Sequence, residues 1–497
     1  MTLRGVARGS LLYSIGFVLP RIGTFLLLPI YVTVLSTADF GAVALVVSVA
    51  QLVATFLRMG MDGALMRMHF DSSDPARQNR LLATVASMTA VVATLGALVA
   101  AALSYFFFET LFAGLEFIPY GATAAALSFT VTFQYFPATV FRAREQPARF
   151  VAFTGGAFVI TATVTVVALL VLDAGVVGAL AGQLAGGIFV VAVSAVMLLR
   201  AGGPAIDPAL ARGALNFGLP LVPHALAGWA LNVSDRWLLS FLLPLPAAAA
   251  RSAIGVYSLG YQLSYAIDLL AQSFNAAWVP FFYRYGATPQ GPGILREMTT
   301  LTMAAFSAIA AILAVNGTLV VTVIASPDFA EAADLIPILA PAFVAHVFYI
   351  SVVTVIFHER RTRILPLITA AAAGVNVLTN IVLIPRLGIV GAAWATLVAF
   401  LFMAVVTTIA AGRVYRLELD WLRLVALFAV VIAASIFALA SGDELDLQRV
   451  VVDIGVSTLV ALVALAIALA PAGSLRALTR AATRDAQTRA ADQGEAG

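Results

Sequence analysis

Long apolar runs alternate with short polar connections along almost the whole chain. A helix that crosses the hydrocarbon core of a bilayer needs about 20 consecutive, mostly apolar residues. Fourteen runs of this kind occur before residue 471. We therefore predict an all-α polytopic membrane protein with about 14 transmembrane helices. The predicted spans lie near residues 10–34, 40–65, 80–106, 118–141, 150–172, 177–199, 213–242, 252–283, 297–325, 333–356, 364–384, 388–411, 421–440 and 448–470.

Basic residues are concentrated in alternate connections between these runs. All 28 basic residues are arginines, and 22 of them lie in the connections on one side and at the two chain ends. Three lie in the connections on the other side (Arg251, Arg386 and Arg449), and three lie within spans (Arg21, Arg58 and Arg236). Arginine and lysine in short loops are retained in the cytoplasm. We therefore predict a protein of the bacterial inner (cytoplasmic) membrane with both termini cytoplasmic.

Composition narrows the possible chemistry. The chain is 62% hydrophobic and only 11% charged, and it contains no cysteine, no lysine and only four scattered histidines. These absences exclude disulfides, thiol catalysis, a P-loop lysine and a Schiff base, and they leave no sequence pattern for a zinc site. We expect no metal, no cofactor and no enzymatic activity. The net charge of +3 reflects membrane topology and not an affinity for nucleic acid.

Short sequence similarities recur at an offset of about 214 residues. GVVGALAG at 175–182 resembles GIVGAAWA at 388–395, and DFGAVAL at 39–45 resembles AIGVYSL at 253–259. A duplicated unit of six helices keeps both copies in the same orientation, so a pseudo-two-fold axis along the membrane normal relates them. The repeat thus predicts two six-helix lobes that face a shared cavity.

The repeat also predicts the division of the chain. We expect an N-lobe at 1–200 (helices 1–6), a C-lobe at 201–412 (helices 7–12), two extra C-terminal helices at 413–470 and a cytoplasmic tail at 471–497.

Polar stripes at helical spacing run along the first two helices of each repeat. Ionisable residues within a span are costly and usually face a cavity or a partner, so these stripes are candidate functional surfaces. The stripes are Ser14, Phe17, Arg21 and Thr24; Gln51, Thr55, Arg58 and Asp62; His224, Gly228, Asn232 and Asp235; and Tyr261, Tyr265, Asp268, Gln272 and Asn275.

Each stripe also has a purely structural interpretation. Arg58 and Asp62 are four residues apart and are close enough to pair on one helix surface. Arg236 follows Asp235 directly and cannot face the same way, so one of the two either points toward the other lobe or extends outward, and we expect a structural role for Arg236. His224 follows two prolines and suits a core imidazole at a kink.

Two of the ionisable residues lie deep within their spans. Arg21 and Asp268 are too far from the span ends for their side chains to reach water easily. They either line a cavity or form a structural salt bridge with each other or with Asp235. His346, alone in the tenth span, has the same core interpretation as His224.

Two segments carry a resemblance to a known group of transporters. They are SLLYSIGFVLPRIGTFLLLPIYVTVLSTADFGAVALVVSV at the start and LNFGLPLVPHALAGWALNVSDRWLLSFLL at helix seven. With GVYSLGYQLS and the GIVGAAWA hairpin, they resemble the polysaccharide (Wzx-type oligosaccharide-lipid) flippases of the multidrug/oligosaccharidyl-lipid/polysaccharide exporter superfamily. The resemblance covers nearly the whole chain.

The resemblance implies a flippase that moves a polyprenyl-pyrophosphate-linked oligosaccharide, a precursor of surface polysaccharide such as lipopolysaccharide or exopolysaccharide, to the outer face of the membrane by alternating access. Arginines in the cavity would bind the pyrophosphate, Arg21 first and Arg58 second. The expected sugar-binding residues are Asn232, Tyr265, Gln272 and Asn275. Expected partners are membrane lipid and the glycan polymerase and glycosyltransferases of the same pathway.

Several alternatives stay open at this point. Lipid II flippases share the architecture, and drug/cation antiporters belong to the same superfamily; a structural partner in a glycan-export assembly is a different class. A proton or sodium gradient or the membrane potential would drive transport, because the chain has no ATPase motif. The candidates for ion coupling or salt bridges are Asp62, His224, Asp235 and Asp268.

Overall fold

The computed structural model describes residues 16, 19–20, 23, 25–286, 288–442 and 446–469. Within these ranges the secondary structure is helical, without a strand. A first apolar helix covers Phe25–Val34. The other helices of the first half are α2 (Thr37–Leu57), α3 (Met61–His69), α4 (Pro75–Leu111), η1 (Phe117–Gly121), α5 (Ala122–Thr132), α6 (Phe136–Ala143), α7 (Pro147–Leu170) and α8 (Gly175–Arg200).

The second half continues with helices of the same kind. They are α9 (Pro208–Gly218), η2 (Leu219–Leu221), α10 (Val222–Leu242), α11 (Ala247–Tyr285), α12 (Gly291–Val315), α13 (Gly317–Ile324), η3 (Pro327–Leu335), α14 (Ile336–His358), η4 (Thr362–Ile364), α15 (Leu365–Gly412), α16 (Trp421–Ala440) and α17 (Leu447–Leu469).

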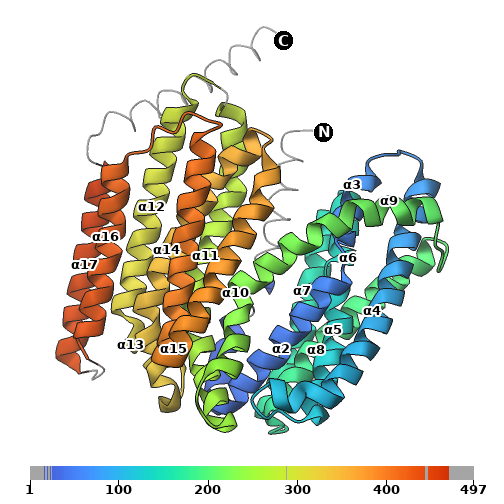
Figure 1. The fold of residues 1–497 in the computed structure, drawn as a ribbon, viewed down its shortest axis with the longest axis horizontal. Helices are drawn as coiled ribbons and strands as arrows, with labels where there is room; N and C mark the ends of the chain where they lie inside the picture. The colour runs from blue at the N-terminus through green and yellow to red at the C-terminus, as the bar shows by residue number, and fades with distance from the viewer. Residues whose placement is uncertain are drawn as a thin grey trace.

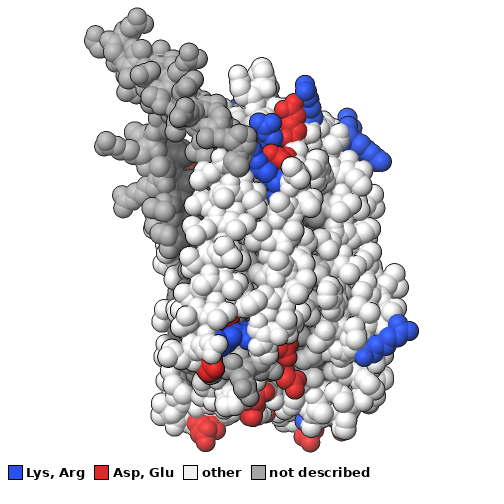
Figure 2. Space-filling view, turned by 90° about the vertical axis from the view of Figure 1, so that its left-hand side faces the viewer, with Lys and Arg blue, Asp and Glu red and all other residues white. Residues whose placement is uncertain are grey.

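The helices have the length and composition of membrane spans. Ten helical stretches among the described residues are long and apolar enough to cross a bilayer. On the face shown in Figure 2, charged side chains gather at the two ends and a broad uncharged band lies between them. The predicted class, an all-α polytopic membrane protein, is confirmed. The number of 14 crossings stays a prediction, because length and composition identify ten stretches.

Each of the two corresponding hairpins of the predicted repeat contains a glycine with a positive φ. Gly175, between α7 and α8, has a φ of 51°, and Gly388, at the break inside α15, has a φ of 60°. Only glycine adopts this left-handed region without strain. The break makes α15 two helices joined at Gly388, in the same way that α7 and α8 are joined at Gly175. The sequence repeat is thus also a structural repeat at this turn.

Two helical spans are interrupted next to each other. α2 ends at Leu57, and α3 begins after Met59 and Gly60, both of which have positive φ. The chain from α9 to α10 passes through the short helix η2 at Pro220. Gly60 and Gly218 are in backbone contact, and neither has space for a Cβ atom. The two interruptions therefore pack directly on each other.

The helices form two groups that meet along α2, α10 and α11. α2 to α8 form one group and α11 to α17 the other, with α10 between them (Figure 1). α9 packs on α3 and α4 of the first group, whereas α10 packs on both α2 and α15. One helical stretch therefore spans both groups, and the predicted lobe boundary at residue 200 stays a prediction.

The crossing of α2 and α11 is reciprocal. A Cβ on Gly41 would meet the carbonyl oxygen of Arg251, and a Cβ on Gly255 would meet that of Thr37. Thr37 and Gly41 are each 214 residues before their counterparts Arg251 and Gly255, which is the offset of the sequence repeat. A pseudo-two-fold relation between the repeats accounts for this symmetry of contact.

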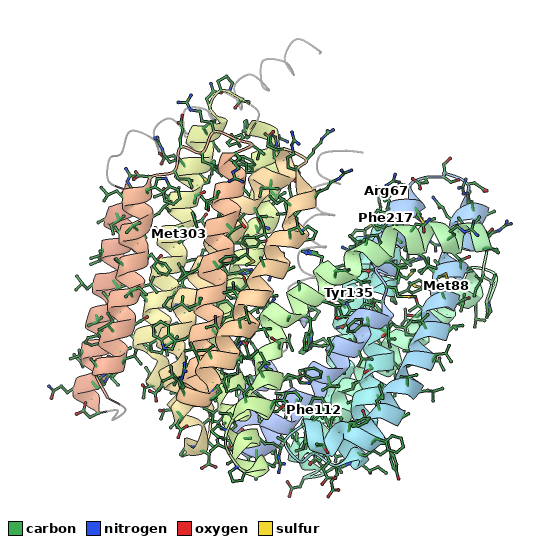
Figure 3. All side chains as sticks on the ribbon, viewed as in Figure 1. Arg67, Met88, Phe112, Tyr135, Phe217 and Met303 are labelled. Atoms are coloured by element: carbon green, nitrogen blue, oxygen red, sulfur yellow. The ribbon has the colours of Figure 1, made fainter. Side chains whose placement is uncertain are left out.

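Contacts between the groups are concentrated at one end. Arg251 donates a hydrogen bond from its guanidinium to the backbone oxygen of Ala113. The backbone N–H of Ser326 donates to the oxygen of Val32 at 3.1 Å. The groups diverge toward the opposite end, where the connections rich in arginine lie (Figure 1). Figure 3 shows this contrast, with Phe112 at the closed end and Arg67 and Phe217 at the other.

Candidate functional site

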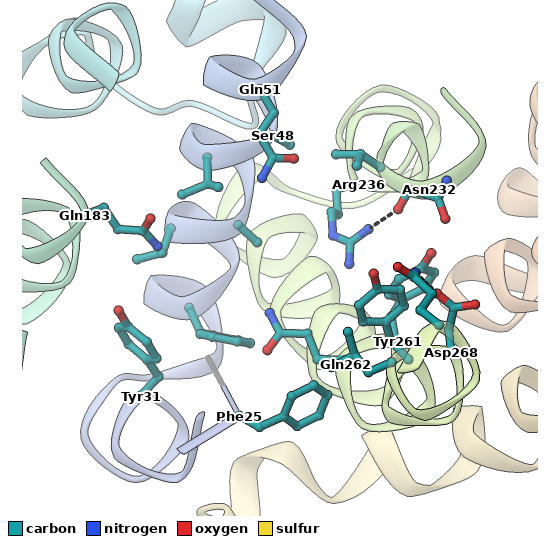
Figure 4. A pocket seen from close by; sticks show the side chains of 18 of the residues that line it. Phe25, Tyr31, Ser48, Gln51, Gln183, Asn232, Arg236, Tyr261, Gln262 and Asp268 are labelled. Atoms are coloured by element: carbon teal, nitrogen blue, oxygen red, sulfur yellow. Dashed lines mark hydrogen bonds between the residues drawn. The ribbon is translucent and has the colours of Figure 1, made fainter. Parts of the chain in front are cut away.

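A cavity of about 480 Å³ lies between the two groups of helices (Figure 4). Its wall comes from the first apolar helix, α2 and α8 on one side, and from α10, α11 and α14 on the other. The lining residues are Phe25, Tyr31, Phe40, Val43, Ala44, Val47, Ser48, Gln51, Gln183, Asn232, Val233, Arg236, Tyr261, Gln262, Tyr265, Asp268, Leu269, Gln272 and His346. The first two helices of each predicted repeat all contribute residues to this lining.

On α10, two residues four apart share the cavity face. Asn232 and Arg236 both line the cavity, and the Arg236 guanidinium donates to the backbone oxygen of Asn232 at 3.1 Å. The Arg236 side chain is buried and faces the cavity, so of the two orientations expected for this pair it takes the one toward the other lobe and does not extend outward. Residues four apart differ by only about 40° around a helix. Asp235 belongs to a different face.

The Arg236 guanidinium lies against aromatic rings and not against a carboxylate. Its central carbon is 4.5 Å from the ring centroid of Tyr261 and 5.7 Å from that of Tyr257. Among the described residues, no carboxylate lies within 4.0 Å of it. A cation held by ring faces in a cavity keeps donors available for an anion, because the rings attract the charge without neutralising it. Arg236 is therefore a candidate anion-binding group.

Asp235 is fully buried behind the cavity wall, between α10, α11 and α15. Its carboxylate accepts hydrogen bonds from Tyr257 Oη at 2.6 Å, Asn380 Nδ2 at 2.8 Å and Thr396 Oγ1 at 3.0 Å. All three donors are neutral. Asp235 forms no salt bridge with any residue that the structure describes, and its suggested role in ion coupling stays a prediction.

A second buried carboxylate reaches the cavity wall. Asp268 Oδ1 is 2.5 Å from Nδ1 of His346, and Asp268 Oδ2 accepts a hydrogen bond from Gln272 Nε2 at 2.6 Å. The His346 ring stacks on Phe400 at a centroid distance of 4.7 Å and on Tyr349 at 5.4 Å. His346 is therefore not an isolated core imidazole, because it lines the cavity and has an acidic partner.

Uncharged residues form the described part of the opposite wall. Ser48 and Gln51 come from α2, Gln183 from α8 and Tyr31 from the first apolar helix. Figure 4 shows Gln51, Gln183 and Tyr31 on this side and Arg236, Tyr261 and Asp268 across from them. The side chain of Ser48 donates to the oxygen of Leu45 in its own helix. This wall offers amides and hydroxyls as hydrogen-bonding groups.

The structure places Arg58 and Asp62 outside the cavity lining. Arg58 caps the end of α2 with its guanidinium 4.5 Å from the ring centroid of Tyr135, and no ion pair joins it to Asp62. The helix interruption at Met59 and Gly60 separates them, which is why the four-residue spacing does not produce contact. Their roles in binding or coupling stay predictions.

The other predicted site residues are scattered. Asn232, Tyr265 and Gln272 line the cavity, whereas Asn275 lies further along α11, outside the lining. His224 is exposed on the first turn of α10 and is not a core imidazole. Arg21 and the predicted tail at 471–497 lie outside the described residues.

The sequence patterns did not single out several polar residues of this region. Asn376 and Asn380 are buried on α15, four residues apart in an otherwise apolar helix, and this spacing was a usable signal. Gln183 carries no such signal, because it is a single amide in an apolar span. In the described part of the chain, no three acidic or histidine side chains are arranged to hold a metal.

Comparison of the chain with models of known protein families gives a match over more than half of its length. The family model of the polysaccharide biosynthesis protein matches residues 6–285. The chain belongs to this family. The predicted family is thereby confirmed, and the protein is a multi-pass membrane protein of that family. No curated protein sequence matches the chain.

Solved structures share the fold at low sequence identity. The lipid II flippase MurJ in an inward closed conformation superposes with a TM-score of 0.71 at 14% identity, over 92% of this chain and 99% of that one. An inward-facing multidrug resistance MATE family transporter of the MOP superfamily gives a TM-score of 0.63 at 14% identity, over 82% and 95%. A MATE transporter of Vibrio cholerae gives 0.58 at 15% identity, over 86% and 98%. The first of these structures is named as a flippase and the other two as transporters.

Proposed function

We propose that this polysaccharide biosynthesis family protein is a flippase for a lipid-linked oligosaccharide that carries a pyrophosphate. The observation that supports this most is the cavity between the two helix groups, with the Arg236 guanidinium on its wall. The cargo headgroup would enter the cavity, and the lipid tail would stay between helices in the bilayer. Alternating opening of the two ends would then move the headgroup outward without ATP hydrolysis.

Arg236 is the described residue best placed to bind the pyrophosphate. A guanidinium presents a planar fork of N–H donors that matches phosphate oxygens. In the described part of the chain, no carboxylate competes with phosphate for this guanidinium within 4.0 Å. We also propose Arg21 as a second cation of the cavity, because the sequence resemblance implies it.

Neutral groups around Arg236 suit the sugars. Tyr261 and Tyr265 are stacked with their rings 16° from parallel, and such faces bind the apolar faces of sugar rings. Amides from both walls provide donors and acceptors for hydroxyl groups. These amides belong to Gln51, Gln183, Asn232, Gln262 and Gln272.

The alternatives differ in what they require of the cavity. A structural partner in an export assembly needs no polar cavity, so the observed one favours transport. An enzyme would need catalytic groups around a reacting bond, and we propose none. A drug/cation antiporter requires an accessible acid, and Asp268 is paired with His346. A lipid II flippase has the same requirements as the proposed function, and identification of the cargo separates the two.

Transport also requires a driving force, and we propose an ion gradient or the membrane potential. Asp235 and Asp268 are the buried carboxylates nearest the cavity, and both belong to the second helix group. Transport in proteoliposomes that is indifferent to imposed proton and sodium gradients and to the membrane potential would contradict this part of the proposal.

The orientation follows from charge. We propose that the end rich in arginine faces the cytoplasm, so that the structure is open inward and both chain ends are cytoplasmic in the inner membrane. Reporter fusions after Arg363 and after Ala113 test this, since the first should be cytoplasmic and the second external.

The decisive experiment uses a strain whose surface glycan depends on this protein. We expect Arg236→Ala to reduce glycan export at least about tenfold, because a hydrogen bond to a charged group contributes roughly 1.5–3 kcal/mol. Arg236→Lys should retain part of the activity. Arg386→Ala, at an exposed arginine in the same half, is the matched control and should export normally. Normal export by Arg236→Ala at normal protein level would overturn the assignment.

A further inference from the structure

One arginine joins the two groups of helices at the closed end of the cavity. Arg251, in the second turn of α11, donates a hydrogen bond from its guanidinium to the backbone oxygen of Ala113, in the turn that follows α4. Ala113 and Gly114 have φ angles of 50° and 71°, and this sharp turn brings the Ala113 carbonyl to α11. A Cβ on Gly114 would lie 3.1 Å from the Cβ of Ala247, so the turn rests directly on α11.

The other two arginines that lie in connections of this side do not link the groups. Arg449 is paired with Asp453 on its own helix, and Arg386 is exposed. The contact from Ser326 to Val32 does cross between the groups, but it joins backbone atoms and depends on no side chain. Among these three arginines, Arg251 is therefore the one that fastens one helix group to the other.

This link exists in one copy of the repeat and not in the other. The backbone of Arg251 packs on Gly41 in the same way as that of Thr37 packs on Gly255. Thr37 is the counterpart of Arg251 at the offset of 214 residues. A threonine carries no cation and has no long side chain that could reach across to a neighbouring turn. The backbone crossing is thus symmetrical, whereas the side chain that fastens it is not.

Acidic residues of the first group lie around this link. Asp39 is in the first turn of α2, and Glu116 directly precedes η1. The charges of Asp39, Glu116 and Arg251 all act on the hydroxyl of Tyr120. This surrounding negative charge attracts the guanidinium while the end is closed. When the end opens, water replaces the Ala113 oxygen as its acceptor, so the net free energy of the bond is small and the link is reversible.

We propose that Arg251 is the latch of the outer end, and that its hydrogen bond to Ala113 breaks each time the protein opens outward. The inference rests on the proposed alternating access and adds the residue that sets its balance. Outward opening moves the turn after α4 away from α11, and the bond is made only while this end is closed. An interaction present in one of two states shifts the equilibrium toward that state, so removal of the guanidinium favours the outward-open one.

A single cysteine in the cavity measures this equilibrium without any cargo. The chain contains no cysteine of its own. Ala44 lines the cavity three residues after Gly41, so Ala44→Cys places one thiol next to the crossing of α2 and α11. A membrane-impermeant maleimide reaches this thiol from the outer face only while the outer end is open. Labelling rates in right-side-out and inverted membrane vesicles therefore report opening at the two ends separately.

We expect Arg251→Ala, combined with Ala44→Cys, to raise the labelling rate from the outer face at least about tenfold, because the closed end loses a hydrogen bond from a charged donor. The rate from the cytoplasmic face should stay close to that of the parent protein. Arg251→Lys keeps a cation and a donor, so its outer-face rate should lie between the two. Arg386→Ala, at an exposed arginine of the same side, is the matched control and should label as the parent protein does.

Two results in Arg251→Ala would overturn the inference. The first is an outer-face rate equal to that of the control. The second is an equal rise from both faces, because it would show a general loosening of the helices and not the opening of one end. Faster labelling of the parent protein from the outer face would overturn the assignment of the closed end as the outer one.

The labelling and export experiments fail independently of each other. Labelling needs no cargo, so an unchanged rate in Arg251→Ala removes the latch and leaves the flippase function standing. Normal glycan export by Arg236→Ala removes the proposed pyrophosphate site and leaves the latch standing.

Discussion

The two walls of the cavity have repeat-related backbones but different chemistry. Ser48 and Gln51 of α2 are 214 residues before Gln262 and Tyr265 of α11, and all four line the cavity. Among the described lining residues, however, the charged or titrating groups other than tyrosine come from the second half. Among the described lining residues, the first copy thus contributes a neutral polar face and the second copy contributes the ionisable groups.

This difference separates two tasks that transport requires. A neutral wall of amides and hydroxyls binds sugars without a large desolvation cost, since each polar group loses only one or two hydrogen bonds to water. Charged groups respond to phosphate and to protons, but they need a surrounding network. Such a network is present around Asp235 and around Asp268 in the second half. We therefore expect substitutions in the two walls to have effects on stability and export that differ in size and in kind.

The largest effect should follow removal of the Asp235 carboxylate. Asp235→Ala leaves Tyr257, Asn380 and Thr396 without their acceptor, and a buried unsatisfied group costs about 1–3 kcal/mol. We expect a loss of about 3 kcal/mol or more in stability, seen as a lower melting temperature in detergent. Ser48→Ala in the first half breaks only a hydrogen bond within its own helix and should change the stability by less than about 1 kcal/mol. Equal losses of stability in the two variants would contradict the proposed difference between the two walls.

A smaller and symmetrical effect should follow substitution at the crossing of α2 and α11. Gly41→Ala and Gly255→Ala each place a Cβ against a backbone carbonyl of the other helix. Overpacking of this kind costs about 1–3 kcal/mol. Because the contact is reciprocal, the two variants should lower the melting temperature by similar amounts. Gly374→Ala, where a Cβ meets nothing within 4 Å, is the control. A large difference between the first two variants would argue against the pseudo-two-fold relation.

A moderate effect on export should follow loss of the ring that supports Arg236. Tyr261→Leu removes a cation–π contact worth about 0.5–2 kcal/mol, so export should fall roughly two- to thirtyfold. Tyr261→Phe keeps the ring, and the buried hydroxyl has no hydrogen-bond partner among the described residues, so this variant should export normally. If both variants export equally well, the ring does not position the guanidinium.

The smallest effects should come from the neutral wall. Gln51→Ala and Gln183→Ala each remove one amide, and a neutral hydrogen bond contributes about 0.5–1.5 kcal/mol. We expect export to fall by no more than about tenfold in either variant. A complete loss of export in either variant would show that the neutral wall contributes more than single hydrogen bonds.

Sequence patterns predicted much of the architecture, because membrane helices are defined by local properties. Apolar runs of span length can only be helices in a bilayer, since each backbone group must find its partner within the segment. The repeat was equally visible, because Gly175 and Gly388 occupy turns that need a positive φ. Sequence patterns were less informative about which way each polar side chain of a helix points, as the stripe from His224 to Asp235 shows. Its members are an exposed imidazole, a cavity amide and a carboxylate that faces α15.

The sequence by itself determined the membrane class, the repeat and the family, because hydrophobicity, arginine placement and turn glycines act locally. Only the tertiary structure decided which polar side chain meets which. Arg236 faces the cavity, while Asp235 one residue earlier is sealed by donors from α11 and α15. His346, one of the partners of Asp268, is 78 residues away on α14. Such pairings depend on how helices are rotated and packed against one another, and no local pattern specifies that rotation.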